Sequence, residues 1–321
     1  MGVCFDKICI VGAGSYGTAL AQCLSQKSNG ILLISDMASI ASSINEYHVN
    51  KEMLDGIYLS PDIRCSTDIA DISDSDLVFV AVPASVVRTV CQQIADIGID
   101  KHLVLCSKGI DIENACLITE MVEQILSNDL VVFSGPSFAQ EMARGLPVGI
   151  NVAGKKRELA DHLANALSYP SFRLKAIDDY IGLQVAGAFK NVLAVGAGIL
   201  AGFDCGNSAA AKLIVDGLEE VMRLAVAMGG KNDTFFELGG IGDTILTCTG
   251  TKSRNAQFGK YLAVGGALAN WNGSLVEGAL TGRSIPAFEK KYGISMPICH
   301  AVHDIIYAQN NAHHLVEIIA A

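Results

Sequence analysis

One lysine stands alone in a long apolar stretch of the chain. Lys190 is the only charged residue between Leu183 and Phe203, and Asn191 follows it directly. A helix that is apolar on every face is buried, and a lysine is almost never fully buried unless it is paired or used in chemistry. Because burial lowers the pKa of an ammonium group toward neutral pH, Lys190 is a candidate general acid and base. The alternative is that its charged end reaches solvent along an apolar surface.

A glycine-rich segment follows the first strand-like run. Gly12, Gly14 and Gly17 form a G-x-G-x-x-G pattern between the run Lys7–Val11 and a helix-like segment. Glycines at these positions let the backbone approach a pyrophosphate, and the start of the helix offers free N–H groups. We therefore expect a dinucleotide cofactor at this segment, with the alternative of an incidental glycine-rich turn.

The end of the second expected strand bears on the choice of dinucleotide. An acidic residue there accepts hydrogen bonds from the ribose of NAD, whereas a basic residue accommodates the extra phosphate of NADP. Here Ser35 and Asp36 are followed by Met37 and Ala38, with no Arg, Lys or His. We expect Ser35 and Asp36 at the cofactor ribose; the alternative for Asp36 is a helix N-cap.

Two further polar sets lie in the last third of the chain. Asp243 and Thr247 follow a glycine cluster and are four residues apart, so they share a face of a helix; the alternative for Asp243 is a helix cap. Ser253 is placed to cap the next helix, which puts Arg254 and Asn255 in its first turn. A helix start and a forked guanidinium together favour a phosphate group. The alternative for Arg254 is an exposed helix charge.

Polar segments also follow two of the expected strands. Lys108 comes directly after the run Leu103–Ser107, and the segment Ser134–Glu141 begins at the end of the run Leu130–Ser134. Ligands of open α/β sheets bind beyond the carboxyl ends of the strands. We therefore expect both segments to face the cofactor, with a solvated Lys108 as the alternative.

The elements that would position these residues follow an alternating pattern. Short apolar runs rich in β-branched residues alternate with helix-like segments up to about Asp178, which predicts a doubly wound parallel sheet, α/β and Rossmann-like. Beyond that point Ala-, Gly- and Leu-rich helical segments dominate. We therefore expect a dinucleotide-binding domain over 1–180 and a mainly α-helical, substrate-binding domain over 181–321. The expected strands are Lys7–Val11, Ile31–Ser35, Leu77–Val82, Leu103–Ser107, Leu130–Ser134, Val148–Val152 and Phe172–Lys175.

Composition excludes several other classes of protein. The chain of 321 residues has only 17% charged residues and a mean hydropathy of +0.38, which leans toward a membrane protein. The longest stretch without a charge, Ile8–Gln26, is interrupted by polar residues, so we expect no membrane span and, with no secretory signal, a cytoplasmic protein. The net charge of −10 argues against a nucleic-acid partner. The ten cysteines contain no C-x-x-C pair, and we expect reduced thiols and no metal site, including at Cys299, His300 and His303.

Taken together, these segments resemble a known family. The chain is similar to the bacterial-type, NAD(P)-dependent sn-glycerol-3-phosphate dehydrogenases, and the similarity spans almost the whole chain in the family's order. The resemblance implies reversible reduction of dihydroxyacetone phosphate to sn-glycerol 3-phosphate, which supplies glycerophospholipid synthesis, with NAD(H) or NADP(H) as cofactor. It also implies a homodimer and a helical domain like the C-terminal domain of 6-phosphogluconate dehydrogenase. The segments that carry it are Gly12–Ala21, Ser107–Gly109, Ser134–Glu141, Gly187–Gly198, Gly239–Gly259 and Val276–Gly278.

The resemblance also implies a role for individual residues. Lys190 corresponds to the family's general acid and base, and Lys108 to a lysine shared by cofactor and substrate. The positions matching substrate contacts or their polar supports are Gly135, Ser137, Asn191, Asp243, Thr247, Ser253, Arg254 and Asn255. Those matching cofactor contacts are Ser15, Tyr16, Ala139, Arg254, Leu275 and Glu277.

The chain departs from the family pattern at two places. Many bacterial relatives carry Arg or His at about Ser35, so the serine and the following Asp36 predict a preference for NAD(H). Near Ala210 and Asp216 relatives commonly carry basic residues, which puts local contacts there in doubt. Two other functions stay open: another two-domain dehydrogenase similar to ketopantoate reductase, and a dinucleotide sensor that has lost catalysis.

Overall fold

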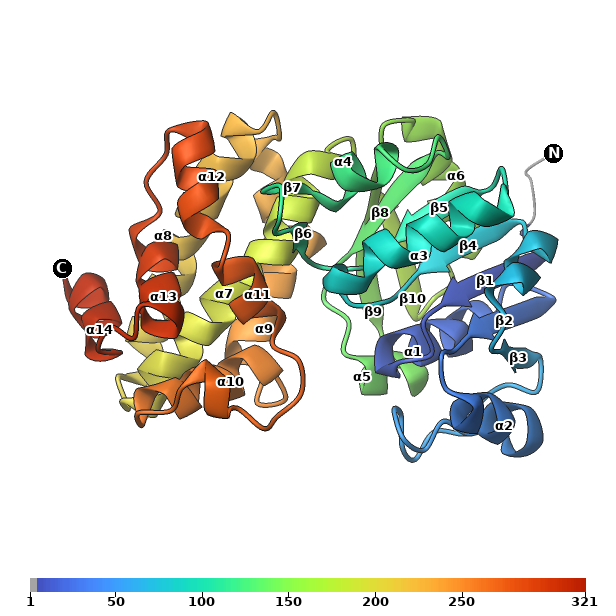
Figure 1. The fold of residues 1–321 in the computed structure, drawn as a ribbon, viewed down its shortest axis with the longest axis horizontal. Coiled ribbons are helices and arrows are strands. Elements are labelled where there is room, and N and C mark those ends of the chain that lie inside the picture. The colour runs from blue at the N-terminus through green and yellow to red at the C-terminus, as the bar shows by residue number, and fades with distance from the viewer. Residues whose placement is uncertain (1–4) are drawn as a thin grey trace. The chain divides into compact units, whose positions relative to one another are not determined.

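The computed structural model describes residues 5–321, which form two compact units (Figure 1). The sheet unit comprises the chain up to Ser107 together with Thr119–Tyr180, and the helical unit comprises Lys108–Ile118 together with Ile181–Ala321. The chain therefore passes into the helical unit at Lys108, returns at Thr119, and enters the helical unit again after Tyr180. The expected division into residues 1–180 and 181–321 assigns Lys108 to the sheet domain, whereas in the structure Lys108 belongs to the helical unit.

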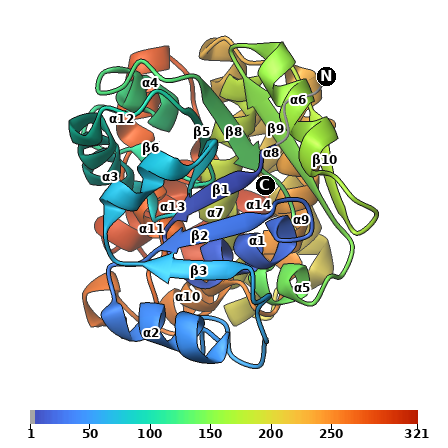
Figure 2. The same cartoon turned by 90° about the vertical axis from the view of Figure 1, so that its right-hand side faces the viewer.

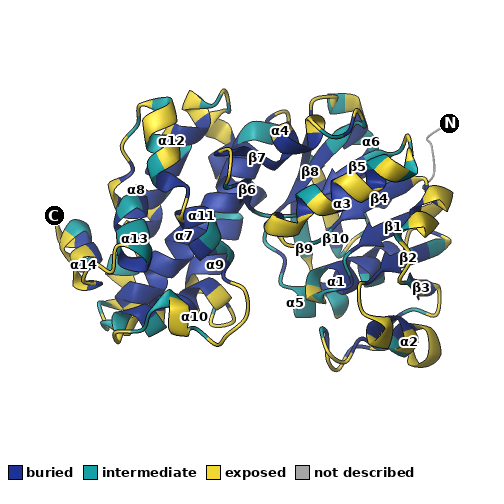
Figure 3. Cartoon of the chain, viewed as in Figure 1, coloured by how far each residue is buried: buried dark blue, intermediate teal, exposed yellow. Residues whose placement is uncertain are grey.

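The sheet unit contains eight strands in the order β10-β9-β8-β5-β4-β1-β2-β3. Most neighbouring strands are parallel, as between β1 and β2, where Lys7 pairs with Gly30 and Val11 with Ile34. The central strands are largely dark blue in Figure 3, and the apolar residues of β1 and β4 are buried, as expected for strands covered on both faces. The strands are β1 (Lys7–Val11), β2 (Gly30–Ile34), β3 (Ile63–Ser66), β4 (Leu77–Val80), β5 (His102–Leu105), β8 (Leu130–Ser134), β9 (Val148–Gly154) and β10 (Phe172–Ala176).

The predicted Rossmann-like class is confirmed, with two differences in the sheet. β9 runs antiparallel to β8, with Val131 opposite Gly154, and β10 then runs parallel to β9, so the sheet is not wholly parallel. The link from β8 to β9 contains only the short helix α5 and returns the chain to the end of the sheet at which β8 finishes. The edge strand β3, which lies beside β2 in Figure 2, is absent from the expected strands because its four residues include an exposed Arg64.

Helices connect the strands and cover them. α2 packs against β3, and α6 packs against β9 and β10. The helices of the sheet unit are α1 (Ser15–Leu24), α2 (Ala38–Tyr47), α3 (Ala84–Ile97), α4 (Ile118–Glu123), α5 (Ala139–Ala143) and α6 (Arg157–Leu167). Cys116 and Leu117 form the small strand β7, so α4 begins only at Ile118.

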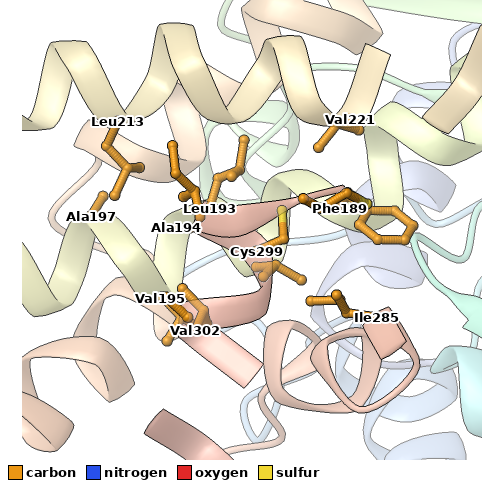
Figure 4. Packing of buried hydrophobic residues seen from close by; sticks show 14 of the residues in the cluster. Phe189, Leu193, Ala194, Val195, Ala197, Leu213, Val221, Ile285, Cys299 and Val302 are labelled. Atoms are coloured by element: carbon orange, nitrogen blue, oxygen red, sulfur yellow. The ribbon is translucent and has the colours of Figure 1, made fainter. Parts of the chain in front are cut away.

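The helical unit is built around α7 (Tyr180–Gly202), whose residues are buried almost throughout. In Figure 4, Phe189, Leu193 and Ala194 of α7 lie among side chains from α8 and α13, including Val221 and Cys299. The other elements are α8 (Gly206–Ala227), α9 (Asp243–Thr249), α10 (Arg254–Ala263), α11 (Glu277–Gly282), α12 (Ile285–Tyr292), α13 (Pro297–Tyr307), α14 (His313–Ala320) and the two-residue strands β6 (Ile110–Asp111) and β7 (Cys116–Leu117).

The helix α7 is also long and apolar enough to cross a membrane by length and composition alone. In its most apolar window, however, 89% of the residues are buried inside the fold, as in the central helix of a protein core.

Most of the described cysteines are buried, and His300 is paired with a carboxylate. Cys4 lies outside the described residues, and none of the other nine cysteines forms a disulfide within the described part of the chain. Burial raises the pKa of Cys9 to about 12, so this thiol is inert at neutral pH. His300 pairs with Glu289 at 2.5 Å. Within residues 5–321, no group of three or more His, Cys, Asp and Glu side chains is placed to hold a metal ion.

Candidate active site

Three charged side chains meet inside the helical unit, and we call them the Lys–Asp–Lys cluster. Asp243 lies between Lys190 and Lys108: Lys190 Nζ donates to Asp243 Oδ1 at 2.6 Å, and Lys108 Nζ donates to Asp243 Oδ2 at 2.8 Å. Lys190 and Asp243 are buried, with 5% and 1% of their surface exposed. The lysine side chain at 190 thus does not extend to solvent, and the one at 108 is paired rather than free in water. The single carboxylate leaves the cluster with one surplus positive charge.

The electrostatics of the cluster follow from burial and charge. Burial lowers the pKa of Lys190 from 10.5 to about 8; Asp243 opposes this shift, and the second cation, Lys108, adds to it. For Asp243, burial alone would raise the pKa of the carboxyl, but the two ammonium groups outweigh burial and hold it below its usual range. The carboxylate therefore stays ionised, while Lys190 can gain and lose a proton near neutral pH.

Local chain geometry explains how Asp243 reaches this position. The glycine run before α9 passes so close to the chain at Thr234 and Phe235 that a Cβ on Gly240 would lie 2.6 Å from their carbonyl oxygens. The residue preceding α9 is Gly242, and the Asp243 side chain does not cap the helix but faces the lysines. One turn later, Thr247 accepts a hydrogen bond from Lys190 Nζ at 2.7 Å and donates to the Asp243 carbonyl at 2.6 Å.

A row of hydrogen bonds ties the cluster to α10 and α11. Asn191 Nδ2 donates to the Lys108 carbonyl at 3.3 Å, and Asn255 Nδ2 donates to Asn191 Oδ1 at 2.9 Å. Asn255 Oδ1 in turn accepts from the Gly278 N–H at 2.9 Å. Among residues 5–321, Asn255 thus uses its acceptor and one of its two donors, which leaves one N–H of the amide for a ligand.

The start of α10 has the expected layout. Ser253 Oγ accepts a hydrogen bond from the Ala256 N–H at 3.3 Å, which confirms the predicted cap. Arg254 is the first residue of the helix and is exposed, in keeping with either a ligand contact or a solvated charge. Leu275 is exposed just before α11, and Glu277 is its first residue.

Glycines let α10 approach α7 closely enough to bring these side chains together. A Cβ on Gly198 of α7 would lie 2.1 Å from the Ala256 carbonyl, and a Cβ on Gly259 of α10 would lie 2.1 Å from the Val195 carbonyl. Backbone packs directly on backbone at this crossing, so any larger side chain would force the helices apart.

Lys108 reaches the cluster on a small hairpin that the sequence did not reveal. Strands β6 and β7 each have two residues, too short to show a strand pattern. Ile110 and Leu117 belong to the apolar core of the helical unit, and Lys291 Nζ donates to the carbonyl of Ala115 at 3.0 Å. In the sequence, this hairpin is marked by no more than apolar residues on both sides of a polar turn.

The glycine-rich loop lies in the sheet unit, between β1 and α1. Gly12 has a φ of +113°, and a Cβ there would lie 2.7 Å from the Ala81 carbonyl; on Gly17 it would lie 1.9 Å from the Gly12 carbonyl. At Gly14, the residue before α1, a Cβ would meet nothing within 4 Å. The loop is therefore packed tightly on the protein side and open at the start of the helix, which fits the pyrophosphate of a dinucleotide.

The other expected contacts of the sheet unit lie in α1 and in the segment that follows β8. Ser137 is buried and donates to the Gly135 carbonyl at 3.0 Å, with the Tyr16 hydroxyl 3.5 Å away. A Cβ on Gly135 would lie 2.8 Å from the Gly149 carbonyl, so close strand packing is a second reason for that glycine. Ala139 begins α5, and the Ser15 hydroxyl donates to the Met53 carbonyl.

The residues at the end of β2 are acidic or neutral. Ser35 is buried and accepts a hydrogen bond from the Met37 N–H at 3.1 Å, while Asp36 is exposed. The residue before α2 is Met37, without a side-chain cap, so Asp36 does not serve as the N-cap of this helix.

A Rossmann-like sheet with an open glycine loop, and a helical unit with a buried lysine of lowered pKa, define a dinucleotide-dependent dehydrogenase. The models of the NAD-dependent glycerol-3-phosphate dehydrogenase N-terminus and C-terminus match residues 7–160 and 179–317. The chain belongs to this family, as the sequence resemblance predicts.

The similarity to individual relatives supports the same family. The chain is 38% identical to the glycerol-3-phosphate dehydrogenase (NAD(P)+) of Parvibaculum lavamentivorans, over 95% of this chain and 93% of the relative. It is 39% identical to that of Nitrosomonas eutropha, over 94% of each. The crystal structure of glycerol-3-phosphate dehydrogenase from Coxiella burnetii superposes with a TM-score of 0.93 at 30% identity, covering 98% of this chain and 99% of the other. A probable 2-dehydropantoate 2-reductase from Bacillus subtilis shares only the fold, with a TM-score of 0.61 at 16% identity.

Proposed function

We propose that this chain catalyses the reversible, NAD(P)H-dependent reduction of dihydroxyacetone phosphate to sn-glycerol 3-phosphate, and so supplies glycerophospholipid synthesis. The observation that carries this proposal is the Lys–Asp–Lys cluster: Lys190 is buried, has a pKa of about 8, and is held by Asp243 and Thr247. A catalytically silent sensor has no need of a buried lysine poised to exchange a proton. Family membership supports the same reaction.

Lys190 is the residue that gives a proton to the substrate oxygen during reduction and takes it back during oxidation. Its pKa of about 8 lies close to neutral pH, where proton transfer in both directions is then efficient. Asp243 and Thr247 position the ammonium group through hydrogen bonds of 2.6 and 2.7 Å. Lys108 adds a second positive charge, which stabilises negative charge that develops on the carbonyl oxygen.

The start of α10 is the part of the helical unit that suits the substrate phosphate. Arg254 supplies a forked, permanently charged donor, and Asn255 supplies an amide N–H. The positive end of the helix dipole, beyond Ser253, favours an anion at the same place. Gly135 and Ser137 of the sheet unit, and Asn191, are the remaining proposed substrate contacts or supports.

The sheet unit would hold the cofactor, which supplies the hydride to carbon 2 of the substrate. Gly12, Gly14 and Gly17 suit its pyrophosphate because the loop is open at Gly14 and closed elsewhere. The further proposed contacts are Ser15, Tyr16, Ser35, Asp36, Lys108, Ala139, Arg254, Leu275 and Glu277.

We further propose a preference for NAD(H), a homodimer and a cytoplasmic location. The preference rests on the exposed carboxylate of Asp36 and on the absence of any cation among residues 35–38, since a carboxylate there repels the additional phosphate of NADP. The homodimer rests on the family resemblance, and light scattering of the purified protein measures it directly.

A panel of substrates separates this function from a ketopantoate reductase. We expect NADH oxidation with dihydroxyacetone phosphate, and a far lower kcat/KM with dihydroxyacetone, because only the phosphate ester can use the start of α10. Turnover of ketopantoate in preference to dihydroxyacetone phosphate would contradict the proposal.

A further inference from the structure

One buried asparagine contacts the glycine-rich loop from outside the motif. Asn50 follows α2, is 1% exposed, and lies in the segment that leads to β3. Its Nδ2 donates to the Ala13 carbonyl at 2.9 Å and to Thr18 Oγ1 at 2.8 Å. Thr18 Oγ1 also approaches the Ala13 carbonyl, at 3.3 Å. The amide of Asn50 therefore makes the shorter of two hydrogen bonds to the same carbonyl.

The orientation of this amide is set by the loop. A carbonyl oxygen only accepts hydrogen bonds, so the reversed amide would place Asn50 Oδ1 against the oxygen of Ala13. In the observed orientation, Asn50 Oδ1 is buried without a hydrogen-bond partner among residues 5–321. An unpaired buried acceptor costs free energy. The protein thus tolerates an unsatisfied oxygen at Asn50 in order to hold the Ala13 carbonyl.

Holding that carbonyl has a direct consequence for the next residue. The peptide bond between Ala13 and Gly14 is trans and planar, so its C=O and N–H point in opposite directions. When Asn50 holds the Ala13 oxygen on the protein side, the Gly14 N–H must face the other way. Gly14 directly precedes α1, and the space beside its Cα is open.

We propose that Asn50 is a positioning residue for the cofactor: by holding the Ala13 carbonyl, it presents the Gly14 N–H to the pyrophosphate of the dinucleotide. This inference rests on the proposed binding of NAD(H) at the loop. It assigns to Asn50 a contribution to cofactor affinity through the backbone, without contact with the cofactor.

The test compares Asn50→Ala with the wild type in direct binding of NADH and of ADP-ribose, followed by fluorescence and by calorimetry. We expect both dissociation constants to rise about tenfold, the range of one hydrogen bond to a preorganised donor. The KM for dihydroxyacetone phosphate at saturating NADH should stay within about twofold. ADP-ribose retains the pyrophosphate but lacks nicotinamide, so an equal loss for both ligands locates the defect at the loop.

Asn45→Ala is the matched control. Asn45 lies in the same unit and bridges both backbone groups of Cys65, at 2.8 and 2.9 Å, but does not touch the glycine loop. It should lower the melting temperature without changing the affinity for NADH. If Asn50→Ala does not fold, Thr18→Val carries the test. It removes the hydroxyl that accepts a hydrogen bond from Asn50 Nδ2 and so fixes the amide, and with it the second donor to Ala13, so we expect a loss of NADH affinity of about threefold.

The possible results distinguish a failure of the proposed cofactor function from a failure of the role of Asn50. A wild-type protein that binds neither NADH nor ADP-ribose would overturn the proposed cofactor function itself. A wild type that binds both, with unchanged affinity in Asn50→Ala, or in Thr18→Val where that variant is used, would overturn only the role of Asn50. An equal loss of NADH affinity in Asn45→Ala would also overturn it, because general destabilisation would then be the cause.

Discussion

Replacing Asp243 by asparagine removes the only negative charge of the Lys–Asp–Lys cluster while keeping the shape of the side chain. Lys190 Nζ lies 2.6 Å from one carboxylate oxygen, and Lys108 Nζ lies 2.8 Å from the other. At an effective dielectric constant of about 20, two unit charges whose centres lie about 4 Å apart attract each other by on the order of 4 kcal/mol, or about 3 pKa units. Shifts of about 1–3 units are typical for such partners. Because burial and the repulsion from Lys108 persist, Asp243→Asn should lower the pKa of Lys190 from about 8 to about 7 or below.

The pH dependence of the reduction reports this shift. We expect kcat/KM for dihydroxyacetone phosphate in the wild type to fall as pH rises through about 8, because the general acid loses its proton there. In Asp243→Asn the same fall should occur at least about one unit lower, and the loss of activity relative to wild type should shrink as pH decreases. Oxidation of sn-glycerol 3-phosphate, which needs the neutral amine, should show the opposite trend.

Asp216→Asn is the control for a lost carboxylate. Asp216 pairs with Lys212 at 2.9 Å on the partly exposed face of α8, in the same unit. It should leave the midpoint of the profile unchanged. A wild-type midpoint in Asp243→Asn would refute the reasoning, since it would mean that the carboxylate does not set the pKa of the catalytic group.

Three further predictions concern packing, cofactor choice and stability. Gly198→Ala should destabilise the protein by about 3 kcal/mol or more, because its Cβ would lie 2.1 Å from a backbone oxygen, whereas Gly196→Ala meets only side chains and should cost far less; thermal melting compares them. The ratio of kcat/KM values should favour NADH over NADPH, and Asp36→Arg should reduce that ratio; a wild type that strongly prefers NADPH would contradict it. In the folded protein the pKa of Lys190 is about 8, below its ordinary value of 10.5, so the unfolded chain binds more protons than the folded one between these pH values. The free energy of unfolding of the wild type relative to Lys190→Met, measured by urea titration, should therefore rise from pH 8 to 10.5. A flat or falling difference would exclude this linkage.

The sequence predicted the parts of the fold that have a strong period or an unusual composition. β1 and β8 begin and end where their apolar runs do, and α10 begins directly after its predicted cap, Ser253. The absence of other charges around Lys190 in the sequence indicated that this residue is buried. A helix that is apolar on every face packs into a core, and its single lysine is then buried with the rest of the helix. The identity of the substrate was predicted from the family resemblance and not from the pattern of residues.

The contacts that depend on distant parts of the chain could not be predicted from local patterns. The partner of Lys190 is 53 residues away, and Lys108 meets Asp243 from 135 residues away. Asn50 lies 37 residues from Ala13 and outside the glycine motif, and its burial follows only from the folded path of the segment after α2. The antiparallel direction of β9 was not predicted, because the direction of a strand is set by the connection that precedes it and not by the residues of the strand.

The most direct test of the account is NADH oxidation by the purified protein with dihydroxyacetone phosphate, measured beside Lys190→Ala. We expect the wild type to convert the substrate to sn-glycerol 3-phosphate, and the variant to lose at least about a hundredfold in kcat while still binding NADH. No activity in the wild type, or an unimpaired Lys190→Ala, would contradict the central claim that this buried lysine moves the proton of a glycerol-3-phosphate dehydrogenase.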